Sequence, residues 1–174
     1  MSENGPASPS RAWQNRIVGH GEEDPRDLVA NPRNWRIHPR RQQQALRSAI
    51  SEVGFIRSVT INRRTGYVLD GHLRVLLALR DEEPGIPVEY VDLSETEEAV
   101  AIATLDPLGE AAARDDEQLA TVLDDLDVAD EDLRAFVLEL RDDLKIAAPP
   151  DEFPSYDDDI ETEHECPRCG FRWS

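Results

Sequence analysis

Residues 67–74 have the sequence Tyr67-Val68-Leu69-Asp70-Gly71-His72-Leu73-Arg74, which is the strongest local signal in the chain. The first three residues predict a strand, and the leucine-rich segment 72–80 after Gly71 predicts a helix. A glycine at this junction lets the backbone approach a phosphate, toward which the first helical N–H groups point. Arg74, one turn into the helix, is placed to close over the phosphate oxygens. The stretch therefore predicts an anion-binding corner.

Asp70 and His72, on either side of Gly71, are the candidate catalytic residues of this corner. A carboxylate can hold a metal ion or orient a hydroxyl group, and an imidazole can donate or transfer a proton. The structural alternative makes Gly71 a turn residue, Asp70 a helix cap and His72 a surface histidine. The motif G-x-x-R is too short to choose between these interpretations.

Strands and helices are expected to alternate on both sides of the corner. Apolar residues recur with strand or helix periodicity, and turn residues separate the segments. This pattern predicts an α/β (α+β) domain with a small mixed sheet and flanking helices. The expected elements are a strand at 16–19, a loop at 27–39, a helix at 39–53 closed by Gly54, a β-hairpin at 55–69, a strand at 86–91 and a helix that starts with a capping box at Ser94 and Glu97.

The second part of the chain is strongly acidic. Residues 1–105 carry 13 basic and 15 acidic residues, whereas residues 106–174 carry 6 basic and 22 acidic residues. Apolar residues at helical spacing predict two amphipathic helices, at 111–126 and 131–144. We therefore divide the chain into a disordered leader (1–13), the α/β domain (14–105), an acidic helical region (106–146), an acidic linker (147–163) and a zinc-knuckle-like tail (164–174).

Positive charge is concentrated in one segment. From Arg33 to Arg64 the chain has eight arginines and one acidic residue, Glu52. Such a segment suits phosphate groups or DNA, although a set of solvated surface arginines is an equally good interpretation. The candidates for contact with DNA or phosphate are Arg33, Arg40, Arg41, Arg63 and Arg64.

Composition disfavours several classes of protein. No apolar run approaches the ~20 residues that a membrane span needs, and residues 1–11 lack the apolar block of a signal peptide. We therefore expect a cytoplasmic protein without a membrane partner. The two cysteines, Cys166 and Cys169, are too few and too close to form a disulfide framework.

The segment His164-x-Cys166-Pro167-x-Cys169-Gly170 is typical of one knuckle of a zinc ribbon. Cys166, Cys169 and His164 supply three of the four ligands that Zn²⁺ needs. A second chain, His20, His38 or an acidic side chain would supply the fourth. The alternative is a reduced Cys-x-x-Cys pair that binds no metal.

The order of these motifs over about residues 16–105 resembles the N-terminal domain of the ParB/sulfiredoxin superfamily. Gly71 and Arg74 match the glycine and the second arginine of that domain's G-E-R-R box. The resemblance implies that Gly71, His72 and Arg74 contact nucleotide phosphates, with Arg36 and Asn31 of the first loop nearby. The other matching features are the N-P-x-x-x-R loop at 31–36, the helix ending at Gly54, the strand at 59–62 and Ile86-Pro87-Val88.

Departures from the superfamily pattern limit which functions of the superfamily this chain is expected to share. Sulfiredoxins carry a catalytic cysteine at the position of His72, so sulfinic acid reduction is excluded. Partition ParB proteins continue into a DNA-reading helix-turn-helix domain, whereas residues 111–144 are acidic and would oppose DNA. The D-G-H-x-R variant, with the segment 103–108, is similar to ParB-like domains of phage and mobile elements that are often joined to DNA methyltransferases. No methyltransferase motif follows in this chain, so such an enzyme would be a separate partner.

The resemblance predicts a ParB-like protein of DNA metabolism in a bacterial, archaeal or phage-infected cell. It would bind CTP or ATP with Mg²⁺ and couple nucleotide binding to DNA or to a DNA methyltransferase, and it could form a homodimer. One alternative is an enzyme of the same fold, a phosphotransferase, NTPase or nuclease that uses Asp70 and His72. The other is a non-catalytic adaptor that recruits a partner through residues 111–144 and the tail.

Overall fold

The computed structural model describes residues 13–145, 164–165, 167–168 and 172–173. The chain divides into two compact units, Met1–Leu144 and Lys145–Ser174. Among the described residues, no helix combines the length and the apolar character needed to cross a bilayer.

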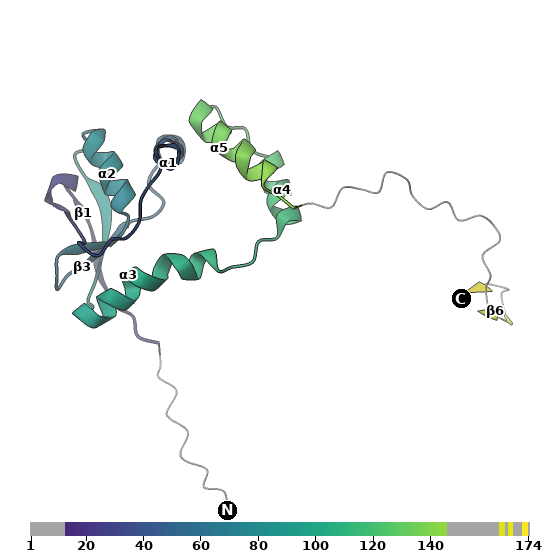
Figure 1. Ribbon diagram of the computed structural model, residues 1–174, viewed down its shortest axis with the longest axis horizontal. Helices are drawn as coiled ribbons and strands as arrows, with labels where there is room; N and C mark the ends of the chain where they lie inside the picture. Colours follow the sequence, from purple (N-terminus) through teal and green to yellow (C-terminus); the bar gives the residue numbers. More distant parts are fainter. Residues whose placement is uncertain (1–12, 146–163, 166, 169–171, 174) are drawn as a thin grey trace, which may run out of the picture. The chain divides into compact units, whose positions relative to one another are not determined.

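The first unit contains a five-stranded mixed sheet, which confirms the predicted fold class (Figure 1). The antiparallel pairs are β1 with β5 and β3 with β4, and the parallel pairs are β3 with β5 and β2 with β4. The hairpin at 55–69 is therefore present. The first strand is longer than predicted, and the two-residue β2 was not expected because it is too short to show a periodic pattern. Across the sheet the order is β1 (Ile17–Glu23), β5 (Ile86–Val91), β3 (Val59–Asn62), β4 (Tyr67–Asp70) and β2 (Val29–Ala30).

The hydrophobic core lies between this sheet and α2 (His72–Arg80). Val75 and Ala78 of α2 belong to the same buried cluster as alternate residues of the central strands, which share one face of the sheet. Because β3, β4 and β5 are anchored in this way, the junction between β4 and α2 has a fixed position. The buried strand residues of the cluster are Val59, Ile61, Val68, Ile86 and Val88.

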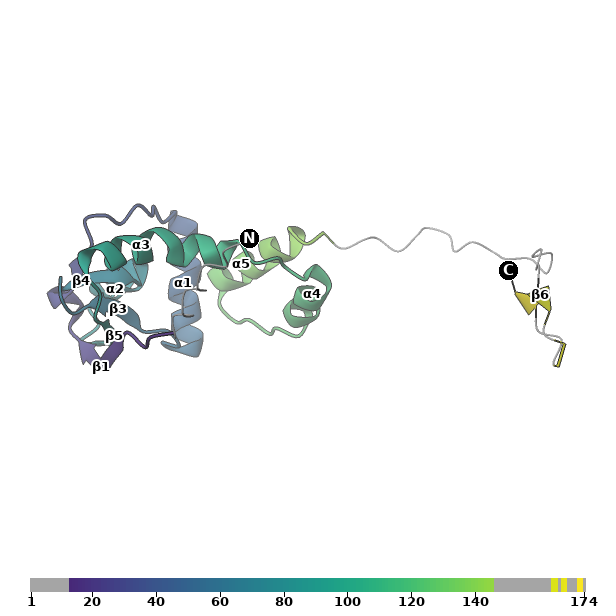
Figure 2. The same ribbon diagram turned by 90° about the horizontal axis from the view of Figure 1, so that it is seen from below.

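Helix α1 (Arg40–Val53) contacts α2, whereas α3 (Glu95–Glu110) contacts β4, and Figures 1 and 2 show α3 running past the strands on the side away from α2. The end of α1 at Gly54 is confirmed, as is the capping box at the start of α3. α3 continues through Pro107 to Glu110, past residue 105, where we expected the α/β domain to end. A proline removes only one helical hydrogen bond at its own nitrogen, so the helix is bent or weakened there without having to stop.

Helices α4 (Asp116–Asp124) and α5 (Glu131–Asp142) belong to the same compact unit as the sheet. Both begin after an aspartate, Asp115 or Asp130, whose side chain caps the helix, so α4 starts later than predicted. α5 packs on α1. In the second unit, the two-residue strands β6 (His164–Glu165) and β7 (Arg172–Trp173) pair antiparallel.

Candidate functional site

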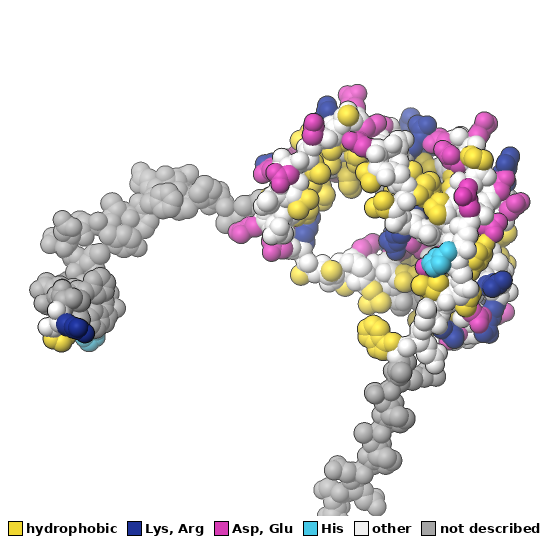
Figure 3. All heavy atoms as spheres, turned by 180° about the vertical axis from the view of Figure 1, so that it is seen from behind, with side chains coloured by type: hydrophobic (Ala, Val, Ile, Leu, Met, Phe, Trp, Pro, Cys, Tyr) yellow, Lys and Arg dark blue, Asp and Glu magenta, His cyan; other side chains and the backbone are white. Residues whose placement is uncertain are grey.

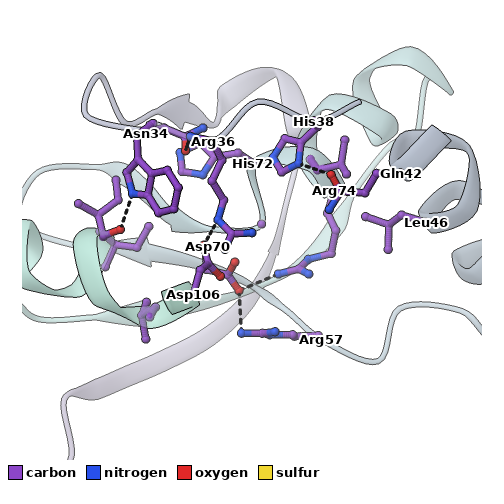
Figure 4. Close-up of a pocket in the computed structure, with 16 residues that line it drawn as sticks. Asn34, Arg36, His38, Gln42, Leu46, Arg57, Asp70, His72, Arg74 and Asp106 are labelled. Carbon is purple, nitrogen blue, oxygen red and sulfur yellow. Dashed lines mark hydrogen bonds and ion pairs between the residues drawn. The ribbon is translucent and has the colours of Figure 1, made fainter. Parts of the chain in front are cut away.

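A cavity of about 230 Å³ lies at the predicted corner (Figure 4). Its walls come from the loop before α1, from α1 itself, from the β4–α2 junction and from α3. The cavity brings together five of the predicted site residues, namely Arg36, Asp70, Gly71, His72 and Arg74. Its apolar lining consists of Trp35, Leu46, Leu69, Leu73, Ile102 and Leu105.

Gly71 occupies a backbone conformation that disfavours any other residue. Its φ is +96°, and a Cβ atom there would lie 3.0 Å from both Arg74 Nη2 and Val59 Cγ2. Gly71 is the N-cap of α2, and no side chain caps the helix. The first helical hydrogen bond runs from Val75 N to Gly71 O at 3.0 Å. Residues 72–74 line the cavity. Their backbone amides come before this first hydrogen bond and therefore have no acceptor within the helix.

Arg74 lies against the cavity with most of its side chain buried, 13% exposed. Its Nη2 donates to Asp70 Oδ2 at 3.0 Å and to the carbonyl of Ser58 at 3.3 Å. Its Nε is buried and has no hydrogen-bond partner among the described residues. Arg57 approaches the same Asp70 oxygen at 3.2 Å, as Figure 4 shows. Asp70 is thus held between two guanidinium groups and does not cap α2.

His72 is half-buried at the first turn of α2, and its Nε2 accepts a hydrogen bond from the backbone N–H of Asn31 at 3.3 Å. Burial lowers the pKa of His72, against an opposing effect of Asp70. A neutral imidazole whose Nε2 is an acceptor carries its proton on Nδ1. In this geometry the ring is a hydrogen-bond donor through Nδ1 only.

Arg36 and Trp35 form the edge of the cavity next to α3. Arg36 forms ion pairs with Asp106 and with Glu110, and its guanidinium lies over the Trp35 ring at 5.3 Å. Trp35 Nε1 donates to the carbonyl of Ile102 at 3.1 Å, while 54% of the residue remains exposed. The loop is therefore fixed to α3 and presents an aromatic surface at the cavity.

Asn31, predicted to lie at the nucleotide, does not line the cavity. It is 3% exposed, and its side chain donates to the buried carboxylate of Glu98 at 3.0 Å. Asn62 and Thr65 donate to the same carboxylate, at 2.6 and 2.5 Å. Sequence reasoning missed this cluster, because nothing in the spacing of four polar residues indicates that they meet. The only feature of the sequence that points to this cluster is the position of Glu98, directly after the capping-box residue Glu97.

The arginine-rich segment does not form an open basic face. Five of its eight arginines pair with carboxylates from other parts of the chain, and Figure 3 shows basic and acidic side chains intermingled over one face of the molecule. Two of the five DNA-contact candidates, Arg41 and Arg64, are among the paired arginines, whereas Arg33, Arg40 and Arg63 are exposed. The pairs are Arg36 with Asp106 and Glu110, Arg41 with Glu139, Arg47 with Asp81, Arg57 with Asp70, and Arg64 with Asp92.

The predicted zinc ligands Cys166 and Cys169 lie outside the described residues, and His164 is exposed in β6. Among the residues that the structure describes, no three His, Cys, Asp or Glu side chains are grouped to hold a metal ion. The zinc knuckle stays a prediction.

Comparisons with known proteins give structural similarities at low sequence identity, two of which are described here. No family model and no curated protein matches the chain. The crystal structure of the C-terminally truncated chromosome-partitioning protein ParB from Caulobacter crescentus complexed with CTP-gamma-S has 17% identity and a TM-score of 0.48, and the match covers 62% of each chain. The Pnob8-like ParB-N domain has 16% identity and a TM-score of 0.45, over 64% of this chain and 47% of that one.

Proposed function

We propose that the cavity binds the phosphates of a nucleoside triphosphate, CTP or ATP. The observation that carries this proposal is that three features surround one cavity: the uncapped amides of α2, the close backbone approach allowed by Gly71, and an arginine with unused donors. Helix N-terminal amides and a guanidinium together suit phosphate oxygens. Both hydrogen bonds of Arg74 use Nη2, and its buried Nε has no partner among the described residues, so the guanidinium has donor capacity beyond these two bonds.

The size and lining of the cavity favour a ligand that is only partly enclosed. At about 230 Å³ the cavity is smaller than the ~300–1,000 Å³ typical of small-molecule sites. It suits the phosphate part of a nucleotide, while the exposed Trp35 ring at its edge offers a surface on which a base could stack.

The charge of the cavity supports a ligand that brings its own cation. Three arginines and two aspartates line it, which leaves one net positive charge against the several negative charges of a triphosphate. Mg²⁺ typically binds through one or two carboxylates plus substrate phosphates, so it would arrive with the nucleotide. Asp70 and Asp106 are the carboxylates within the cavity that could contact it.

Titration calorimetry with CTP, ATP and GTP in Mg²⁺ tests the proposal. Arg74→Ala should weaken the preferred nucleotide about 10- to 100-fold, the loss expected for a charged hydrogen-bond donor. The matched variant is Arg80→Ala, which removes an exposed arginine from the last turn of the same helix and should leave affinity unchanged. Absence of binding to all three nucleotides, or equal losses in the two variants, would overturn the proposal.

Nucleotide-dependent association with DNA is the second part of the proposal. The exposed Arg33, Arg40 and Arg63 are the residues best placed to contact a polyanion without first breaking an ion pair. Fluorescence anisotropy of labelled DNA with and without the bound nucleotide measures this step. Release of inorganic phosphate or cleavage of DNA, if lost in His72→Ala, would instead favour the alternative that the protein is an NTPase or nuclease that uses Asp70 and His72. The phage context, a methyltransferase partner and homodimer formation stay predictions.

A further inference from the structure

Glu98 is a buried carboxylate outside the cavity, on the first turn of α3. Only 4% of the residue is exposed, and its hydrogen-bond donors in the described part of the chain are the neutral side chains of Asn31, Asn62 and Thr65. Burial raises the pKa of this carboxyl group, but hydrogen bonds from Thr65, Asn62 and Asn31 outweigh that effect, so the pKa is lowered. Glu98 is therefore an ionised side chain that accepts hydrogen bonds from three neutral donors, and the charge of Arg33 adds a smaller stabilising effect. A buried charge of this kind persists only if every acceptor site is well satisfied.

A continuous chain of hydrogen bonds leads from Glu98 to the cavity. Glu98 Oε1 accepts from Asn31 Nδ2 at 3.0 Å, and Asn31 Oδ1 accepts from the backbone N–H of Arg33 at 2.9 Å. The side-chain amide is thus fixed at both ends, and the backbone of residue 31 cannot rotate freely. Its N–H donates to His72 Nε2 at 3.3 Å. The orientation of this N–H decides which nitrogen of His72 can carry a proton.

We infer that Glu98 is a positioning residue that, through Asn31, fixes His72 as the neutral tautomer with its proton on Nδ1. His72 then offers the cavity one neutral donor, suited to a phosphate oxygen or to an acceptor atom of a base. The acceptor of this hydrogen bond depends on the proposed nucleotide site, whereas the choice of tautomer does not depend on that site. The other titratable groups that act on His72 are Asp70 from β4, Asp106 from α3 and His38 from the loop before α1.

Reversing the polarity of the Asn31–Glu98 bond tests the inference. In Glu98→Gln the new amide keeps its oxygen toward the two donors Asn62 and Thr65, so its NH2 group faces the NH2 group of Asn31. In Asn31→Asp two carboxylates face each other. Each single variant should therefore shift the loop, so that the hydrogen bond from the N–H of residue 31 to His72 is lost. In the double variant a glutamine donates to an aspartate, which still accepts from Arg33 N, so the bond is restored in the opposite direction. We expect ¹⁵N NMR of the histidine rings to show the Nδ1–H tautomer in the wild type and in the double variant. Each single variant should give a mixed population.

Glu97→Gln is the matched variant, because Glu97 is the neighbouring acidic residue on α3 and is exposed. It weakens the capping box without touching Asn31, so His72 should keep the wild-type tautomer. His72→Gln assigns the resonance among the four histidines. A predominant Nε2–H tautomer in the wild type would overturn the inference even if a variant failed to fold. Single variants with an unchanged tautomer, or a change as large in Glu97→Gln, would also overturn it.

Nucleotide titrations on the same variants separate this inference from the proposed function. If the nucleotide binds, each single variant should weaken binding about tenfold, the effect of one neutral hydrogen bond, and the double variant should recover most of the loss. If no nucleotide binds the wild type, the proposed function fails. The tautomer pattern would then still decide whether Glu98 positions His72.

Discussion

Replacing Gly71 by alanine, with Gly66→Ala as the reference, tests the geometry of the corner most directly. Both glycines have positive φ, +96° and +75°, so an added Cβ costs roughly 1–2 kcal/mol at either position. Nothing lies within 4 Å of the Cβ position at Gly66, which is in the turn between β3 and β4. At Gly71 the same atom meets Arg74 and the fully buried Val59 at 3.0 Å. Such overpacking adds about 1–3 kcal/mol.

We therefore expect Gly66→Ala to lower the free energy of unfolding by about 1–2 kcal/mol and Gly71→Ala by about 2–5 kcal/mol. Urea unfolding followed by circular dichroism measures both values. Gly71→Ala should also weaken nucleotide binding at least about tenfold, since the Cβ displaces Arg74, while Gly66→Ala should bind as the wild type does. In an Arg74→Ala background part of the extra cost at position 71 should disappear, because one of the two crowded contacts is gone.

Equal destabilisation by the two alanines would refute the reasoning. It would mean that the backbone conformation alone requires glycine, and that the close approach of Arg74 has no energetic weight. The same conclusion would follow if the Arg74→Ala background left the cost of Gly71→Ala unchanged.

Three further predictions follow from single contacts. Because burial lowers the pKa of His72, the unfolded state binds more protons than the folded state, so the free energy of unfolding should fall as the pH drops below about 6.5 and level off below the folded-state pKa. Urea unfolding between pH 5 and 8 should show a weaker dependence of this free energy on pH in His72→Gln than in the wild type. The same pH dependence in both proteins would assign the effect to other groups. Ser94→Ala removes the cap of α3 and should cost about 1 kcal/mol in thermal unfolding, a value near zero being inconsistent with the capping box. Glu139→Lys places a second cation beside Arg41, so hydrogen exchange should speed up in α5 but not in β3 or β5; unaltered exchange in α5 would show that this pair does not fix the helix on α1.

Local patterns in the sequence predicted the elements well. The apolar spacing of residues 40–53 followed by Gly54 gave α1 its correct end, and Ser94 with Glu97 gave α3 its correct start. The end of α3 had no comparable signal, because a proline such as Pro107 removes a hydrogen bond without dictating how the chain continues.

Contacts between distant residues were much harder to predict. Counting arginines between Arg33 and Arg64 located the positive charge correctly but not the carboxylates that neutralise it, which lie up to 98 residues further along for Arg41 and Glu139. The side chain of Asn31 was expected at the nucleotide, yet it contacts Glu98, 67 positions away. The direction in which a polar side chain points depends on the packed fold and leaves no periodic trace in the sequence.

The arginine–carboxylate pairs have a thermodynamic consequence for any polyanion that this protein meets. A ligand that reaches Arg41 or Arg64 has to displace Glu139 or Asp92, so the contact exchanges one anionic partner for another. Fewer counterions are then released per contact than open arginines would release. The logarithm of the binding constant should fall with salt less steeply than the ~0.9 per phosphate contact of ordinary DNA binding. For this protein, a weak dependence of binding on salt would indicate that phosphates replace carboxylates as the partners of the arginines, and it would not indicate a small interface.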